Sequence, residues 1–269
     1  MIEKFIKETR IFEILYQRVV FHDLSTKQQL LDYINSYVQY KGIGAVKLQE
    51  SYQAFLKQYS KDVKYFVEQG KYPGFDSARP YPVTREDYDI ALLLSTILSQ
   101  HRFEIMHELK QLPVISTAAL VIGCGAGVDI ELIKDKYEML DAYDTSLDPF
   151  CMHAHPEVSF FEKEFVGVSD TTYDDIFIIE LLEHVVDPFE LIRNAAQVLK
   201  TGGRIIVTLA VDMPQFDHLY NFSDRGHFMQ EIKKLGLYAD YERSILHDSL
   251  RSMLSTSSNV FIVLKELGQ

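Results

Sequence analysis

The chain has 269 residues, of which 47% are apolar and 25% charged, so a disordered or collagen-like protein is excluded. Lys and Arg number 27 against 39 Asp and Glu, and the formal net charge of −12 disfavours nucleic-acid phosphates and anionic membranes as partners. No apolar run could cross a bilayer, the first twenty residues are too charged for a signal peptide, and Cys124 and Cys151 lack a paired spacing. We expect a cytoplasmic protein with a small-molecule or protein partner.

The N-terminal half is predicted to be helical, because apolar residues recur at intervals of three and four from Ile2 to about Leu112. Ser25 with Gln28 resembles a capping box, and Thr84 with Asp87 caps a later helix. The aromatic residues of this half form either a lid over a hydrophobic substrate or simply the helical core. The first predicted helix face comprises Ile2, Phe5, Ile6, Phe12, Tyr16, Val19 and Val20. A later helix face comprises Leu48, Tyr52, Phe55, Leu56 and Tyr59. Between that later helix and Thr84, an irregular loop is predicted from Gly70, Pro73, Gly74, Pro80 and Pro82.

After Pro113 the pattern changes to short apolar runs that alternate with helical stretches, which is typical of a buried parallel sheet with helical crossovers. Asp187, Pro188 and Glu190 form a strong helix start. The predicted strands are Ala118–Ile122, Met139–Tyr143, Val158–Phe161, Ile176–Ile179 and Arg204–Leu209, with Tyr238–Ile245 and Asn259–Lys265 as a final antiparallel pair.

A glycine-rich turn follows the first predicted strand directly. The sequence Gly123-Cys124-Gly125-Ala126-Gly127 lets a ligand approach bare backbone, although tight turns are the commoner reason for such glycines. Asp144 ends the second strand and could accept hydrogen bonds from both hydroxyls of a ribose, or cap a helix. Glu164 follows the third strand. Because the carboxyl ends of parallel strands meet at one edge, these groups are expected to share a crevice.

These features resemble the class I S-adenosylmethionine-dependent methyltransferases, and the resemblance runs from about Ala118 to Lys265. Its most specific stretch is Tyr173–Pro188, with an E-x-x-E-H turn at residues 180–184, followed by an L-K-x-G-G turn within Val198–Arg204. Small-molecule members of the family show this order. The resemblance implies an α/β fold, with a doubly wound, Rossmann-like, mostly parallel sheet, an antiparallel C-terminal strand and an N-terminal helical cap.

The resemblance also implies which residues bind the cofactor. Gly123, Cys124, Gly125 and Gly127 would lie under the methionine part, with Glu180 and Leu181 beside it. Asp144 would hold the ribose, Thr145 would lie beside the adenine, and Glu164 with Phe165 would meet its polar edge. One position departs from the family: Val121 stands where an acid usually precedes the first glycine. Glu180 or a loop carbonyl would then replace that acid. An arginine among Arg79, Arg85 and Arg102 could meet the cofactor's carboxylate, although exposed helix surface explains these arginines equally well.

The E-x-x-E-H turn also supplies the candidate catalytic residues, His184 and Glu183. A hydroxyl or ammonium nucleophile must lose a proton, and histidine titrates in the useful range; the alternative is that His184 only packs beside the cofactor. The turn is also similar to that of metal-dependent RNA 2′-O-methyltransferases of the small-RNA type. By that likeness Glu180, Glu183, His184 and His227 would hold a divalent ion. The charge of −12 argues against this alternative, so we expect no metal.

The sequence thus predicts a helical cap at residues 1–115 and an S-adenosylmethionine-binding domain at residues 116–269. The expected activity is methyl transfer to an oxygen or nitrogen of a small molecule, without a nucleic-acid or membrane partner. Two alternatives stay open: a binding module that kept the pocket without catalysis, and another transfer on the same fold, such as aminopropyl transfer. The sequence identifies neither the acceptor nor the oligomeric state, for which a homodimer is one option.

Overall fold

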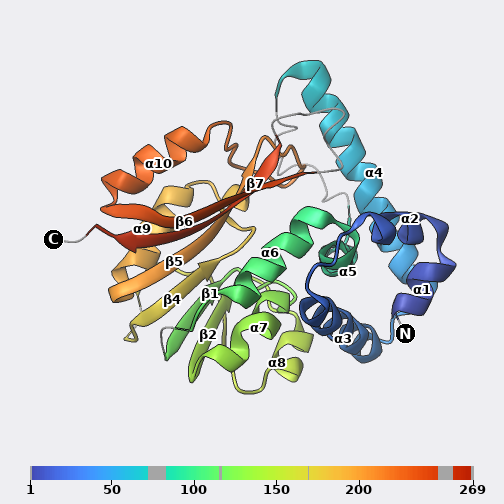
Figure 1. The fold of residues 1–269 in the computed structure, drawn as a ribbon, viewed down its shortest axis with the longest axis horizontal. Helices are drawn as coiled ribbons and strands as arrows, with labels where there is room; N and C mark the ends of the chain where they lie inside the picture. Colours follow the sequence, from blue (N-terminus) through green and yellow to red (C-terminus); the bar gives the residue numbers. More distant parts are fainter. Residues whose placement is uncertain (1, 72–82, 115–116, 169, 248–256, 268–269) are drawn as a thin grey trace.

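A helical N-terminal half precedes the sheet, as predicted. The computed structural model describes residues 2–71, 83–114, 117–168, 170–247 and 257–267, and Figure 1 shows its elements. The irregular loop predicted from the prolines falls mainly on residues 72–82, outside the described residues. The six helices described before the sheet are α1 (Ile2–Glu8), α2 (Arg10–Arg18), α3 (Leu24–Lys41), α4 (Ala45–Gln69), α5 (Arg85–Leu98) and α6 (Gln100–Gln111).

Helix boundaries differ from the prediction in two places. The first predicted helix is broken at Thr9 into α1 and α2, and Val20, assigned to its buried face, is 67% exposed. The start of α3 is capped by Asp23, whose carboxylate accepts from the backbone N–H groups of Ser25 and Thr26, so Ser25 is not the cap. Ser99 separates α5 from α6. The cap of α5 at Thr84 is confirmed.

The sheet has seven strands in the order β3-β2-β1-β4-β5-β7-β6. The first five are parallel, and β7 pairs antiparallel with both β5 and β6, so the predicted fold class is confirmed. The strands are β1 (Ala118–Ile122), β2 (Met139–Asp144), β3 (Ser159–Glu162), β4 (Tyr173–Ile178), β5 (Leu199–Val211), β6 (Leu237–Leu246) and β7 (Ser258–Glu266). Between them lie α7 (Val128–Ile133), η1 (Lys134–Lys136), α8 (Pro149–Ala154), η2 (Leu182–His184), α9 (Pro188–Gln197) and α10 (Arg225–Lys234).

Both faces of the sheet are covered at its centre, which explains why central strands such as β1 and the second half of β5 read as continuous apolar runs. Along β1, Ala119 and Val121 pack in the same cluster as α5, α6 and α7, whereas Leu120 and Ile122 pack with α9 and α10. The N-terminal helices therefore continue the core of one face of the sheet. The division at residue 115 remains a prediction.

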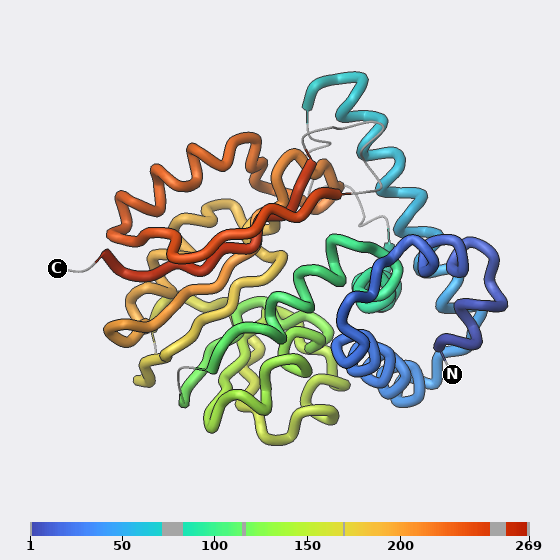
Figure 2. Tube along the Cα trace, viewed as in Figure 1, coloured from blue at the N-terminus to red at the C-terminus, as the bar shows by residue number. Residues whose placement is uncertain are grey.

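The N-terminal helices also contact the glycine-rich turn directly. The Tyr33 hydroxyl of α3 donates to the Ala126 carbonyl over 2.8 Å, and its ring stacks on His155. Figure 2 shows α3 beside the segment that contains α7 and α8, with the two chain ends on opposite sides of the molecule. The helices thus fix the turn from outside the sheet. Within the described residues, no helix has the length and apolarity that spanning a membrane requires.

Candidate functional site

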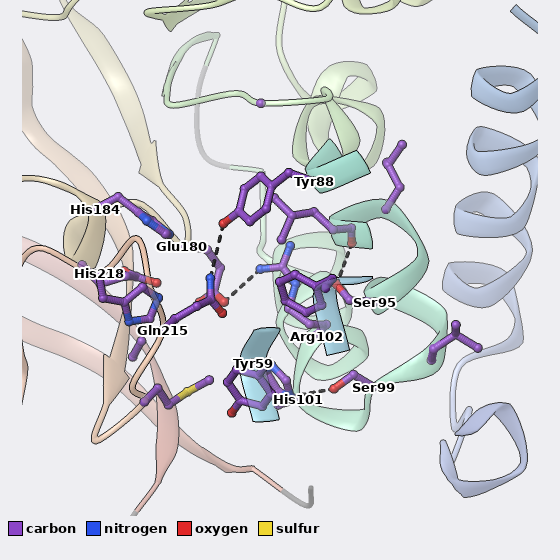
Figure 3. Close-up of a pocket in the computed structure, with 18 of the residues that line it drawn as sticks. Tyr59, Tyr88, Ser95, Ser99, His101, Arg102, Glu180, His184, Gln215 and His218 are labelled. Carbon is purple, nitrogen blue, oxygen red and sulfur yellow. Dashed lines mark hydrogen bonds and ion pairs between the residues drawn. The ribbon is translucent and has the colours of Figure 1, made fainter. Parts of the chain in front are cut away.

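A cavity of about 490 Å³ lies at the carboxyl ends of the strands, between the glycine-rich turn and the N-terminal helices. The turn contributes Gly123, Cys124, Gly125 and Ala126, and the segment after β4 contributes Glu180, Glu183 and His184. Helices α4, α5 and α6 close the opposite side. Figure 3 shows Arg102 of α6 reaching across to Glu180, with His184 and His218 near each other beyond it. Of the strand-end features expected to share one crevice, the cavity lining contains the glycine-rich turn, whereas Asp144 and Glu164 lie outside it.

The three glycines of the turn differ in what they face, although all have positive φ: 77° at Gly123, 50° at Gly125 and 77° at Gly127. A side chain at Gly123 would meet Leu181 at 2.7 Å, and one at Gly127 would meet the Tyr33 hydroxyl at 2.6 Å. Nothing lies within 4 Å of the position a Cβ would take at Gly125. Gly125 therefore has open space where a side chain would stand, whereas Gly123 and Gly127 are also required by protein contacts.

Asp144 braces the glycine-rich turn. One of its carboxylate oxygens accepts from the Gly125 N–H over 2.8 Å, and the other accepts from the Ser146 N–H over 2.9 Å. The helix cap at this point is Asp148, which accepts from the Phe150 N–H. Asp144 thus has a structural role that the sequence did not reveal.

The residues assigned to the adenine side lie at the same edge of the sheet but outside the cavity's described lining. Thr145 and Glu164 are exposed, and Phe165 is buried edge-on against Tyr143. Of the assigned cofactor residues, the cavity brings together the first part of the turn and Glu180. Leu181 packs over Gly123 at its side.

Arg102, Glu180 and Asp129 form a charged group on the cavity wall. An Arg102 nitrogen lies 2.9 Å from a Glu180 oxygen, and the other Glu180 oxygen accepts from Asn259 over 2.7 Å. Arg102 and Asp129 are 8% and 7% exposed, yet Arg102 Nε and Asp129 Oδ1 have no hydrogen-bond partner among the described residues. Burial, with a further contribution from Glu180, raises the pKa of Asp129 to about 7. Two buried polar atoms are thus left for a ligand.

The raised pKa of Asp129 predicts a pH-dependent effect on stability. A carboxyl group whose pKa rises from 3.8 to about 7 on folding favours the fold while it is protonated, and this contribution is lost as the pH rises through about 7. Asp129→Asn should therefore raise the melting temperature of the ligand-free protein at pH 8, by about 2–6 °C, and leave it unchanged near pH 4. Thermal melts at the two pH values check this; an equal shift at both would show that Asp129 is not protonated on folding.

Glu183, His184 and His218 form a second cluster among the residues that line the cavity. One ligand atom from each lies within 4.8 Å of the others. Burial raises the pKa of Glu183 to about 7 and lowers that of His218 to about 3. Burial also lowers the pKa of His184, but the carboxylates of Asp217 and Glu183 outweigh this and raise it overall. Asp217 contacts His184 Nδ1 through both its carbonyl, at 3.2 Å, and its carboxylate, at 3.5 Å.

The four-residue metal set suggested by the sequence is not brought together. His227 lies on α10, is exposed, and pairs with Glu231 and the ring of Phe189. Glu180 is engaged with Arg102 and Asn259. The loop after β5 instead delivers His218, because the N–H groups of Leu219 and Tyr220 donate to the Glu183 carbonyl over 2.8 and 3.0 Å.

The remaining wall of the cavity is largely apolar and aromatic. It is formed by α4, α5, the start of α6, the loop after β5 and the residue that follows β6. Two of these parts carry buried histidines: His101 on α6 and His247 after β6, whose ring centroids are 3.9 Å apart. The apolar and aromatic residues of this wall include Tyr52, Phe55, Leu56, Tyr59, Val63, Tyr88, Leu92 and Met213. The N-terminal aromatics thus serve both as core and as cavity lining.

Sequence reasoning missed Asp129, Asp217 and His218. Asp129 reads as an ordinary helix-start acid, and Asp217-His218 lies in a loop without periodicity. The sequence contains only an indirect indication of Asp129: because Val121 stands where the family usually has an acid, another acid nearby would have to take its role.

Comparison with known proteins agrees with this architecture. Residues 117–243 match the family model described as "Methyltransferase domain". A ubiquinone biosynthesis O-methyltransferase of Saccharophagus degradans is 27% identical over 121 residues, which cover 38% of this chain and 51% of the relative. The corresponding enzyme of Vibrio campbellii is 25% identical over 101 residues, 34% of this chain and 43% of the relative. The chain thus spans about half the length of these curated relatives, or less.

Two solved structures show the same fold. An O-methyltransferase family protein from Burkholderia thailandensis aligns with a TM-score of 0.55 at 16% identity, covering 83% of this chain and 72% of that one. Mitomycin 7-O-methyltransferase aligns with a TM-score of 0.52 at 13% identity, covering 80% and 68%. Both alignments extend beyond the sheet domain into the N-terminal helices.

Proposed function

Residues 117–243 form an S-adenosylmethionine-dependent methyltransferase domain, and from this premise we propose that the chain methylates an oxygen or nitrogen of a small molecule. The observation that carries the proposal is one cavity whose lining combines the charged group of Arg102, Glu180 and Asp129 with an apolar, aromatic wall. The similar relatives act, by their names, in ubiquinone biosynthesis and on mitomycin. Their acceptors are not carried over to this chain.

The residues present fit S-adenosylmethionine at its amino-acid end. Arg102 offers a guanidinium to a carboxylate, and Asp129 with Glu180 offers carboxylates to an ammonium. The partnerless atoms Arg102 Nε and Asp129 Oδ1 would gain their hydrogen bonds there. We propose that Asp129 and Glu180 together replace the acid missing at Val121.

For the nucleoside end we propose the residues that the resemblance assigned. Asp144 already accepts two backbone hydrogen bonds, but a carboxylate has about four acceptor positions, so it can still bind ribose hydroxyls. Thr145, Glu164 and Phe165 lie at the same sheet edge and would contact the adenine.

The acceptor would lie between the turn and the aromatic wall. When bound, S-adenosylmethionine supplies a methyl group on a sulfonium, so the protein must align the nucleophile and exclude water. The rings on α4 and α5 exclude water, and Glu183 and His184 face the space where the acceptor's nucleophilic atom would lie. We propose that these two catalytic residues assist the loss of its proton.

A product assay over a panel of hydroxylated and amine acceptors tests this function. We expect S-adenosylhomocysteine to accumulate with at least one acceptor, and His184→Ala to lower turnover about 10²-fold or more. His227→Ala, which changes an exposed histidine outside the cavity, is the matched control and should retain full turnover. Accumulation of methylthioadenosine would instead indicate aminopropyl transfer. Tight cofactor binding without any product would indicate a binding module.

A further inference from the structure

The cluster of Glu183, His184 and His218 contains buried polar atoms that lack hydrogen bonds to the described residues. Glu183 and His218 are 2% and 6% exposed, and Glu183 Oε2 and His218 Nδ1 have no hydrogen-bond partner within the part of the chain that the structure describes. Leaving a buried carboxylate oxygen and a buried ring nitrogen without hydrogen bonds is energetically unfavourable. One ligand atom from each of the three residues lies within 4.8 Å of the others, so a single bound group could satisfy all of them.

The surroundings of the cluster orient the two imidazoles toward a common point. His184 Nδ1 contacts Asp217, which leaves Nε2 for a ligand, and a backbone hydrogen bond to Met213 engages the His218 ring. Histidines that bind metals usually donate their second ring nitrogen to a carboxylate or a carbonyl in this way. Asp217 is itself held by Gln215, whose amide donates to it over 2.8 Å. This outer layer of support is the part that sequence cannot reveal.

We propose that Glu183, His184 and His218 bind one divalent transition-metal cation at the acceptor end of the cavity. Two imidazoles and one carboxylate suit Zn²⁺, Fe²⁺ or Mn²⁺, whereas Mg²⁺ and Ca²⁺ prefer oxygen ligands throughout. The sequence-based expectation of no metal considered a set that included His227. The structure provides a different third ligand and supports it, so the proposal replaces that expectation.

The site would deepen the proposed function, on which its chemical role rests. Three protein ligands leave positions open toward the cavity, where the acceptor's hydroxyl could coordinate. A bound cation lowers the pKa of a coordinated hydroxyl group. The hydroxyl proton then leaves to solvent, the oxygen forms a bond to the methyl carbon, and the electron pair of the breaking C–S bond stays on sulfur. Glu183 and His184 would thus assist proton loss by holding the ion.

Calorimetric titration of chelator-treated full-length protein with Zn²⁺ alone tests the site. We expect one ion per chain, with an affinity that falls at least about 10²-fold in Glu183→Gln and in His218→Gln. The control His227→Ala should bind the ion like the wild type. An affinity for S-adenosylhomocysteine within about threefold of the wild-type value shows that a variant is folded. If His218→Gln is not folded, the Zn²⁺ titrations of Glu183→Gln and of the wild type decide whether the site exists.

Three outcomes would overturn the proposal: no stoichiometric Zn²⁺ in the wild type, unchanged affinity in Glu183→Gln, or a loss of affinity in His227→Ala equal to that in the cluster variants. Chelation should also lower turnover, and Zn²⁺, Fe²⁺ or Mn²⁺ should restore it where Mg²⁺ does not. A different result would contradict the proposed function, namely no binding of S-adenosylhomocysteine either with or without metal. A protein that binds S-adenosylhomocysteine and turns over after full chelation would retain the function and lose the metal site.

Discussion

Replacing Gly125 with valine should abolish binding of S-adenosylhomocysteine. Gly125 has a φ of 50°, and a side chain there would project into space that is open to 4 Å, on the turn that lines the cavity. We expect the affinity to fall by more than about 10²-fold, because the branched side chain would occupy the space in which the ligand meets the backbone. Calorimetric titration of the purified variant measures this directly.

The control for backbone strain is Gly236→Val, between α10 and β6. Gly236 also has a positive φ, 77°, with open space around it, but it lies outside the cavity lining. Both variants should lose about 1–2 kcal/mol of stability from the left-handed conformation, and only Gly125→Val should lose binding. Equal affinity losses in the two variants would mean that Gly125 serves the turn alone.

Replacing Arg102 with glutamine should weaken S-adenosylhomocysteine binding about 10²-fold, the order expected when a charge-assisted bidentate contact is lost. The affinity for methylthioadenosine, which lacks the amino-acid end, should not change. The ratio of the two affinities therefore isolates the contact between Arg102 and the ligand carboxylate from any general damage to the pocket.

The same pair of ligands tests the carboxylates. Glu180→Gln and Asp129→Asn should each weaken S-adenosylhomocysteine binding and spare methylthioadenosine, because each removes a partner of the ammonium group. If Arg102→Gln weakens both ligands equally, Arg102 acts by holding Glu180 in place and does not bind the carboxylate.

The central strands were predictable because they are buried on both faces, as β1 and β7 are. Strand β1 was placed at its observed bounds, and Asp187 with Pro188 marked the start of α9. These signals are local: an apolar run, a cap and a proline. The break at Thr9 was missed, since the apolar spacing continues through it and only the packing of α1 and α2 reveals two helices.

The site was predictable where it follows the strand ends and unpredictable where it depends on loops. Glu180 and the glycine-rich turn occupy the cavity wall as expected. Asp129 and His218 were missed because their roles arise from contacts between segments distant in sequence: Arg102 approaches Asp129 from α6, and the Glu183 carbonyl holds the loop that carries His218. The metal set expected from the sequence included His227 as the distant histidine and did not include His218, because no spacing rule identifies which histidine joins the turn.

A crystal structure of the protein with S-adenosylhomocysteine tests the central claim most directly. The account predicts the ligand's carboxylate at Arg102, its ammonium at Asp129 and Glu180, and its sulfur facing Glu183, His184 and His218 across the space left for the acceptor. A ligand bound elsewhere, or one whose amino-acid end leaves the Arg102–Glu180 ion pair without contact, would contradict it.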